Sequence, residues 1–178
     1  ERGCPNELWQ LDFKGFFEIQ RRKIIPLTIL DDHSRYLLRH QPTYDMTHQT
    51  AWNVLWDLMG EVGMPQSILC DNYFRSRTPT SSLSWFDAQL LRLDIRPIHG
   101  RVYHPQTQGK VERIHRTLKE EAYPRVDASS IQTFCEGIET WRTEVYNTIR
   151  PHEALGMQPP IARWIPSSCK RPDCLLQI

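Results

Sequence analysis

The stretch HPQTQGKVERIHRTLK, residues 104–119, combines an apolar helical pattern with a cluster of charged side chains. After Gly109, apolar residues recur at the spacing of one helix face, at Val111, Ile114, Leu118 and Ala122. Pro124 ends the pattern, because proline cannot continue a helix. Glu112 lies in the first turn. The stretch therefore predicts a helix that begins after Gly109 and carries one acidic residue near its start.

Several segments that precede this helix in the sequence have the patterns of strands. Residues 9–13 alternate apolar and polar side chains, residues 24–30 are β-branched and apolar, and residues 35–38 predict a third strand or a continuation. Together they predict an antiparallel meander. Residues 67–71 form a nearly continuous apolar run, which is typical of a strand buried on both faces, and residues 95–98 predict another strand.

Three further segments have helical patterns. Residues 47–63 predict an amphipathic helix with a threonine cap and a glycine stop. A capping box at Ser84 and Asp87 opens a short helix to Leu93, and a longer helix is expected over residues 130–149. Strands first, followed by helices that alternate with single strands, predict a mixed α/β layer fold.

The composition indicates one globular domain. The chain has 178 residues, 39% of them apolar, with six Trp, six Tyr and six Phe, so it can bury a core and is no disordered tail. No apolar run approaches the ~18 residues of a membrane span, so no membrane partner is expected. Five scattered cysteines argue against a disulfide framework or a zinc site and favour a reducing interior. The missing initial Met indicates a segment of a longer protein.

The formal net charge of +1 conceals an uneven distribution. Residues 1–70 contain seven basic and nine acidic side chains. Residues 96–119 contain six basic side chains and Glu112 as their one acid, with His99, His104 and His115 in addition. Basic clusters of this kind are the usual contacts for nucleic-acid phosphates.

DNA-binding candidates follow from this cluster. On the expected helix, Arg116 and Lys119 lie four and seven residues after Glu112 and share its face, while Lys110 and Arg113 flank that face. The loop before the helix adds three candidates for contact with bases or sugars, Tyr103, His104 and Gln108. Two plainer interpretations stay open: the basic residues form a solvated helix face, and the loop residues pack locally.

Three carboxylates stand at positions suited to metal chemistry. Asp12 lies within the first strand, Asp71 ends the most buried strand, and Glu112 opens the helix. Ligand sites in open α/β sheets form at the carboxyl ends of strands, and carboxylates gathered there need a cation. Oxygen ligands suit Mg²⁺ or Mn²⁺, and two such ions can stabilise both oxygens of a phosphoryl displacement.

Each carboxylate also has a structural interpretation. Asp71 can cap the turn at Asn72 or Tyr73, and Glu112 can complement the dipole of its helix. Asp32, near the first strand, is a spare carboxylate and a further candidate for approaching the metals.

Several segments of the chain resemble the motifs of one family. Residues 104–119 resemble the catalytic-glutamate signature of bacterial insertion-sequence transposases and retroviral integrases. Other segments resemble that family's first catalytic strand, the strand-turn after it, its second aspartate and its C-terminal motif, at residues 8–13, 31–36, 70–72 and 146–155. The resemblance extends from about residue 5 to about residue 165.

The resemblance implies a ribonuclease-H-like integrase core, with an antiparallel first part of the sheet, parallel later strands and flanking helices. It implies that Asp12, Asp71 and Glu112 form a DDE triad holding Mg²⁺ or Mn²⁺, as two ions. The implied protein is a transposase that cuts insertion-sequence ends and joins the 3′-hydroxyl to target DNA.

The resemblance also bears on organisation and setting. It implies one catalytic domain over residues 1–178, with a core at about 5–165 and a C-terminal tail at 166–178, cut from a longer transposase. A region that binds DNA ends is then expected upstream. A homodimer or larger assembly acting at the bacterial nucleoid, in the cytoplasm, is expected as well.

Two features depart from the family pattern. Tyr73 stands where the family usually has glycine, and 40 residues separate Asp71 from Glu112, a longer interval than usual. If the backbone at Tyr73 needs a positive φ, the site is strained. Two alternatives therefore stay open: a catalytically impaired DNA-binding or assembly module of this fold, and a ribonuclease acting on RNA–DNA hybrids, which shares the fold and the ions.

Overall fold

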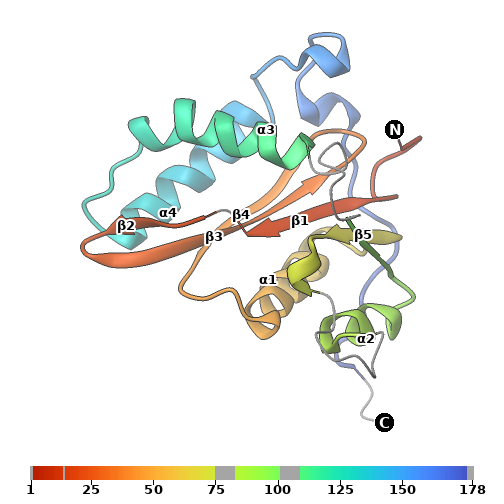
Figure 1. Cartoon of the computed structure of the whole chain (residues 1–178). Coiled ribbons are helices and arrows are strands. Elements are labelled where there is room, and N and C mark those ends of the chain that lie inside the picture. Colours follow the sequence, from red (N-terminus) through yellow and green to blue (C-terminus); the bar gives the residue numbers. More distant parts are fainter. Residues whose placement is uncertain (1, 14, 75–82, 101–108, 176–178) are drawn as a thin grey trace.

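The computed structural model describes residues 2–13, 15–74, 83–100 and 109–175, and Figure 1 shows its layers. Six strands of the described chain form one sheet: β1 Trp9–Phe13, β2 Phe17–Ile19, β3 Arg22–Asp31, β4 Leu37–Thr43, β5 Ser67–Cys70 and β6 Arg96–His99. The long strand β3 pairs antiparallel with β1, β2 and β4. β5 runs parallel to β1, and β6 runs parallel to β5. The predicted mixed sheet is confirmed.

Two parts of the meander differ from the prediction. A short strand, β2, forms a hairpin with β3 through Gln20 and Arg21, whose φ angles are 51° and 64°. Two positive φ angles are typical of a two-residue hairpin turn, which usually contains Asn or Gly. Gln and Arg at these positions therefore do not signal a turn. The third long strand begins at Leu37 because Arg35, with a φ of 61°, still belongs to the preceding turn. Pro42 is tolerated in β4 because, within the described sheet, this strand pairs with β3 alone.

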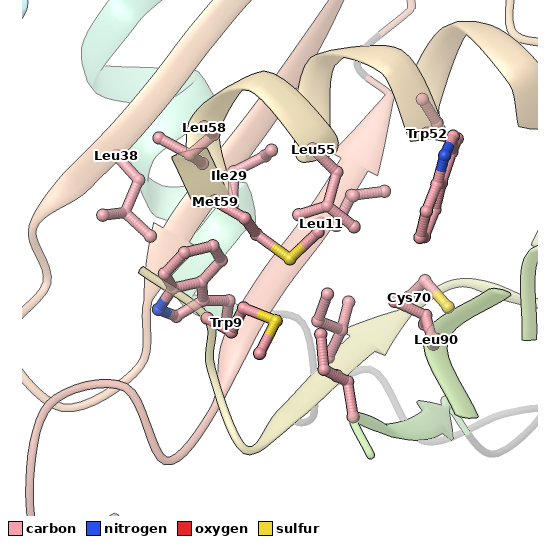
Figure 2. Close-up of a cluster of buried hydrophobic side chains, with 14 of the residues drawn as sticks. Trp9, Leu11, Ile29, Leu38, Trp52, Leu55, Leu58, Met59, Cys70 and Leu90 are labelled. Carbon is pink, nitrogen blue, oxygen red and sulfur yellow. The ribbon is translucent and has the colours of Figure 1, made fainter. Parts of the chain in front are cut away.

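Helices α1 His48–Val62 and α2 Trp85–Leu91 cover one face of the sheet. The Thr47 side chain accepts a hydrogen bond from the backbone of Thr50, and Gly63 ends α1 with a φ of 83°, as predicted. The capping box of Ser84 and Asp87 opens α2, also as predicted. The core on this face packs α1 against the strands, as Figure 2 shows for Trp9, Leu11, Ile29, Leu55 and Met59.

Helices α3 Gly109–Thr117 and α4 Ile131–Thr140 lie on the opposite face (Figure 1). Each continues into a wider π-helical turn, η3 Leu118–Ala122 and η5 Trp141–Tyr146. After η3 the chain enters a short 3₁₀ turn, η4 Tyr123–Arg125. The single long helices expected here therefore change pitch before they end. A second core lies between these helices and the sheet and includes Leu30, Ile114, Leu118, Ile138 and Trp141.

The C-terminal part of the chain packs back onto the domain after two 3₁₀ turns, η6 Glu153–Leu155 and η7 Pro160–Arg163. The ring of Trp164 stacks on Tyr36 with centroids 5.0 Å apart. The guanidinium of Arg171 lies over the ring of Trp56, 4.4 Å from its centroid. Part of the predicted tail, residues 166–178, is therefore held against α1. Within the described ranges, none of the helices is long and apolar enough to cross a bilayer.

Candidate active site

Asp12 and Asp71 lie near the carboxyl ends of two adjacent strands, β1 and β5. β1 and β5 are parallel, and their register pairs Leu11 with Cys70. Asp12 follows the first of these residues and Asp71 follows the second. Because parallel strands have their carboxyl ends at one edge, both aspartates lie where ligand sites of α/β sheets form.

The Asp71 carboxylate takes part in the turn that ends β5. Its Oδ1 accepts a hydrogen bond of 3.0 Å from the backbone N–H of Tyr73, within the 3₁₀ turn η1 Asn72–Phe74. The turn-capping interpretation of Asp71 is therefore confirmed. Burial raises the pKa of Asp71, while the Tyr73 N–H and the nearby His99 partly oppose that effect. Tyr73 is not among the described residues with positive φ, so left-handed strain does not arise at this position.

A histidine–aspartate pair lies beside Asp71 and was not foreseen. His99, at the end of β6, places Nε2 2.9 Å from Oδ1 of Asp87 and Nδ1 3.4 Å from the backbone oxygen of Asp71. Burial raises the pKa of Asp87, but its bonds with His99 and with the Ser84 backbone outweigh burial and lower it overall. The sequence identified Asp87 only as a helix cap, because its second contact depends on where β6 lies.

Asp32 anchors the helix that carries Glu112. Its Oδ2 accepts a hydrogen bond of 2.7 Å from Lys110 Nζ, and its Oδ1 accepts one of 2.6 Å from Gln10 Nε2. Lys110 also donates to the backbone oxygen of Asp32 at 3.2 Å. Asp32 therefore joins α3 to β1 instead of standing as a spare carboxylate. Lys110, a predicted DNA-binding residue, is held in this ion pair.

Helix α3 meets β1 at His115, one helical turn after Glu112. His115 Nδ1 lies 3.7 Å from Asp12 Oδ2, and the His115 side chain is 1% exposed. The position of His115 in the interior corrects the expectation that it adds to the basic surface. Glu112 is exposed and lies three residues before His115, so the two side chains are neighbours on the helix. The turn that carries Glu112 thus adjoins the strand that carries Asp12.

The three carboxylates come from neighbouring elements without forming a ligand cluster. Among the described residues, no group of three His, Cys, Asp or Glu side chains is placed to hold a metal ion. The donor chemistry nevertheless fits a hard divalent cation, because Asp12, Asp71 and Glu112 offer carboxylate oxygens only. Burial raises the pKa of the half-buried Asp71, and a nearby cation would oppose this effect by stabilising the ionised carboxylate.

A basic groove of about 760 Å³ runs along α3 on the side of the C-terminal segment. Its lining includes Arg113 and Arg116 from α3 and Arg150 beyond η5, and its five Lys and Arg side chains outnumber its three glutamates. Arg150 binds Glu121, with Nη2 and Oε1 2.8 Å apart, and this hydrogen bond lowers the pKa of Glu121 despite some burial. Arg150 was not among the predicted DNA-binding residues, since only the fold brings it beside α3.

The other DNA-binding candidates have different positions. Lys110 lines the groove, whereas the exposed Lys119 is not among its lining residues in the described part of the chain. Tyr103, His104 and Gln108 lie outside the described residues.

The chain matches known families over most of its length. Residues 2–105, more than half of the chain, match a family described as an integrase core domain, and residues 93–160 match a second family of that description. Over 115 residues, 65% of this chain, it is 30% identical to the Gag-Pro-Pol polyprotein of squirrel monkey retrovirus and 33% identical to that of Mason-Pfizer monkey virus. The matched segment spans 6% of each polyprotein.

Solved structures share the fold. A chain of the simian T-cell lymphotropic virus intasome, in complex with PP2A regulatory subunit B56 gamma, has a TM-score of 0.70 at 20% identity, over 98% of this chain and 60% of that chain. The HTLV-2 integrase catalytic core domain in complex with magnesium, in its trimeric form, has a TM-score of 0.64 at 16% identity, over 91% of this chain and 99% of that one. These similarities confirm the ribonuclease-H-like fold.

Proposed function

Because the chain belongs to the integrase core domain family, we propose that it is the catalytic core of a DDE transposase, a metal-dependent polynucleotidyl transferase acting on DNA. In the proposed reaction, water cuts one strand at an insertion-sequence end. The freed 3′-hydroxyl then attacks a phosphodiester of the target DNA, and the displaced target 3′-oxygen leaves. The chain acts as one catalytic domain in this proposal.

Asp12, Asp71 and Glu112 are the proposed metal ligands. Two Mg²⁺ or Mn²⁺ ions bound there would stabilise the attacking and leaving oxygens of the displacement. The parallel register of β1 and β5, which brings Asp12 and Asp71 to one edge, is the observation that carries this proposal. The approach of α3 to Asp12 at His115 supports the inclusion of Glu112.

The basic groove along α3 is the proposed DNA contact. Arg113 and Arg116 are exposed there and offer charge to backbone phosphates next to Glu112. Phosphate contacts position DNA without reading its sequence, so these residues would orient the strand and leave end recognition to other parts of the transposase. A dimer or larger assembly is part of the proposal, because transposition joins two DNA ends; the HTLV-2 core occurs in dimeric and trimeric forms. A bacterial insertion-sequence origin, with action at the nucleoid, is the remaining part of our hypothesis.

A catalytically impaired DNA-binding or assembly module is the second candidate. The observation that favours it is the bond between Asp71 Oδ1 and the Tyr73 N–H, which occupies one carboxylate oxygen in turn formation. The impaired module is also supported by the separation of the three carboxylates, which do not form a metal-binding group among the described residues.

Nicking of supercoiled plasmid in Mn²⁺ distinguishes the candidates, because it requires no known end sequence. We expect nicking by the wild-type chain and its loss in Asp12→Asn, Asp71→Asn and Glu112→Gln. Asp57→Asn, which changes an exposed carboxylate on α1, is the matched control and should nick normally. Equal nicking in all four variants would contradict the catalytic assignment. Intact DNA binding without nicking would favour the impaired module, and preferential cutting of RNA–DNA hybrids would favour a ribonuclease.

A further inference from the structure

A hairpin with a run of basic side chains extends beyond the end of β1 at which Asp12 stands. β1 pairs with residues 27–31 of β3, and β2, which follows β1 after three residues, pairs with residues 22–24. β5 pairs with β1 over residues 9–11, so the hairpin of β2 and β3 extends past the carboxyl ends of both β1 and β5 (Figure 1). Residues 16–23 are called the basic hairpin below.

Three consecutive basic side chains, Arg21, Arg22 and Lys23, stand at the tip of the basic hairpin, and all three are exposed. They are three of the seven basic residues in the acid-rich first part of the chain, residues 1–70. Glu18, which pairs with Lys23 in the strand register, is the one acidic residue of the hairpin. Within the described ranges, no ion pair joins an acidic side chain to any of the three. Their charge is therefore open to an external anion.

The basic hairpin is held against the domain by its other side chains. The ring of Phe17 packs against Tyr123 and Phe134, with centroids 5.2 Å away in both cases. At the turn, Gln20 Nε2 donates a hydrogen bond of 2.5 Å to the backbone oxygen of Ser129, just before α4. A hairpin that is already held in place loses little conformational entropy when it binds a partner.

An exposed aromatic ring accompanies the basic side chains. Phe16 is 62% exposed, and Lys23 Nζ lies over its ring, 4.3 Å from the centroid. A cation–π contact of this kind orders the lysine without neutralising its charge. Basic and aromatic side chains together on one exposed surface are typical of nucleic-acid contacts, in which the cations bind phosphates.

Along β3, Asp12 stands between the basic hairpin and the basic groove. Asp12 pairs with Thr28, and Arg22 precedes Thr28 by six residues, a separation of about 20 Å at ~3.3 Å per residue. The groove is lined by Leu30 and Arg35, on the other side of Thr28. Phosphates of one DNA strand are ~3.4 Å apart along the helix axis, so about six steps separate a phosphate at Asp12 from one at the hairpin.

We propose that the basic hairpin is a second DNA contact, in which Arg21, Arg22 and Lys23 bind backbone phosphates about six nucleotides from the reacting one. The inference rests on the proposed function in two respects, namely that DNA is the partner and that Asp12 marks the reacting phosphate. DNA would then be held on both sides of the site, by the groove on one side and by the hairpin on the other. The alternative is a solvated basic tip that contributes to solubility alone.

Binding to a fluorescent DNA duplex in EDTA, measured by anisotropy at several salt concentrations, tests this contact without any metal. The double variant Arg21→Gln with Arg22→Gln should bind more weakly and reduce the slope of log affinity against log salt by about 2, since each lost phosphate contact contributes about 0.9. The matched control, Arg92→Gln with Lys170→Gln, removes two exposed charges after α2 and in the C-terminal segment and should keep the wild-type slope. Equal slopes in the two double variants would overturn the proposal.

A change at Glu18 should act in the opposite direction, which a loss of folding cannot imitate. Glu18→Gln removes the acidic side chain opposite Lys23, so it removes a charge that repels DNA phosphates at the hairpin. We expect the variant to bind the duplex about twofold more tightly than the wild type, the size of effect usual for one exposed charge. An affinity equal to or below that of the wild type would contradict the proposal.

The binding measurement is separate from the test of the proposed function, because it needs neither metal nor cleavage. If the wild-type chain does not nick plasmid but the hairpin variants change the salt slope as expected, the catalytic assignment fails and the hairpin contact stands. If the wild-type chain nicks plasmid and the hairpin variants bind like the control, the hairpin contact fails and the catalytic assignment stands. A wild-type chain that binds no duplex at low salt would overturn the hairpin contact whatever its nicking activity.

Discussion

Lys110 Nζ lies 2.7 Å from Asp32 Oδ2, and this ion pair joins the first turn of α3 to the turn after β3. The two side chains differ in exposure, at 27% for Lys110 and 6% for Asp32. Because of that difference, removing one partner should lower the free energy of unfolding more than removing the other. Lys110→Met leaves a buried carboxylate without its cation, whereas Asp32→Asn leaves an ammonium that can turn toward water.

We therefore expect Lys110→Met to lower the free energy of unfolding by about 2 to 3 kcal/mol and Asp32→Asn by about 1 kcal/mol, as urea unfolding would measure. Both changes loosen the helix that carries Glu112, so both should reduce plasmid nicking. Equal stability losses, or a larger loss in Asp32→Asn, would show that the pair does not anchor α3 in this way.

Asp87 has two roles that substitutions can separate. Ser84→Ala removes the hydroxyl that caps α2 but leaves the bond between Asp87 and His99. We expect it to cost about 1 kcal/mol of stability with little change in nicking. Asp87→Asn removes the carboxylate that holds His99 beside the Asp71 backbone, so it should reduce nicking more than Ser84→Ala does. The idea fails if the two variants, compared at a temperature where both are folded, nick equally well.

Stability should fall on mild acidification because His40 is buried in its neutral form. Burial lowers its pKa from 6.5 to about 3, so below pH 6.5 the unfolded chain takes up a proton that the folded chain does not. The stabilisation is complete above the unfolded pKa and is lost as pH falls toward the folded one. We expect His40 to account for a loss of about 2 kcal/mol between pH 7 and pH 5. Urea unfolding at both pH values should give a smaller difference in His40→Gln, which does not titrate, and an unchanged difference would refute the prediction.

The basic groove predicts graded losses of DNA affinity. Arg116 is exposed, so Arg116→Ala should weaken binding to any duplex and reduce the slope of log affinity against log salt by about 1. Arg150 is engaged with Glu121, so Arg150→Ala should have a smaller effect. Lys170→Ala, an exposed basic residue in the C-terminal segment, is the control and should bind normally. Fluorescence anisotropy at several salt concentrations measures all three, and equal losses would argue against a groove-specific contact.

Secondary-structure features that depend on residues close together in the sequence could be predicted from the sequence. The cap at Thr47 and the capping box of Ser84 and Asp87 were predicted because each depends on residues three apart. The hairpin at Gln20 and Arg21 was missed because its positive φ angles occur without Gly or Asn. The π-helical turns at residues 118–122 and 141–146 were missed because the apolar spacing alone does not distinguish them from an α-helix.

The sequence named the candidate residues, which stay a prediction, but not the contacts that those residues make. Asp12, Asp71 and Glu112 were recognised from their motifs, and the register of β1 and β5 brings the two aspartates to one edge. The sequence did not indicate that Asp32 binds Lys110, or that His115 is buried beside Asp12. These contacts join residues far apart in the chain, so they depend on the packing of α3 against the sheet.

A crystal structure of the protein soaked with Mn²⁺ tests the central claim most directly, because anomalous scattering locates the ion independently of any activity. The account predicts an anomalous peak at the edge of β1 and β5, coordinated by carboxylate oxygens of Asp12 and Asp71, with Glu112 turned inward as a further ligand. No peak there at millimolar Mn²⁺, or a peak held by other residues, would contradict it.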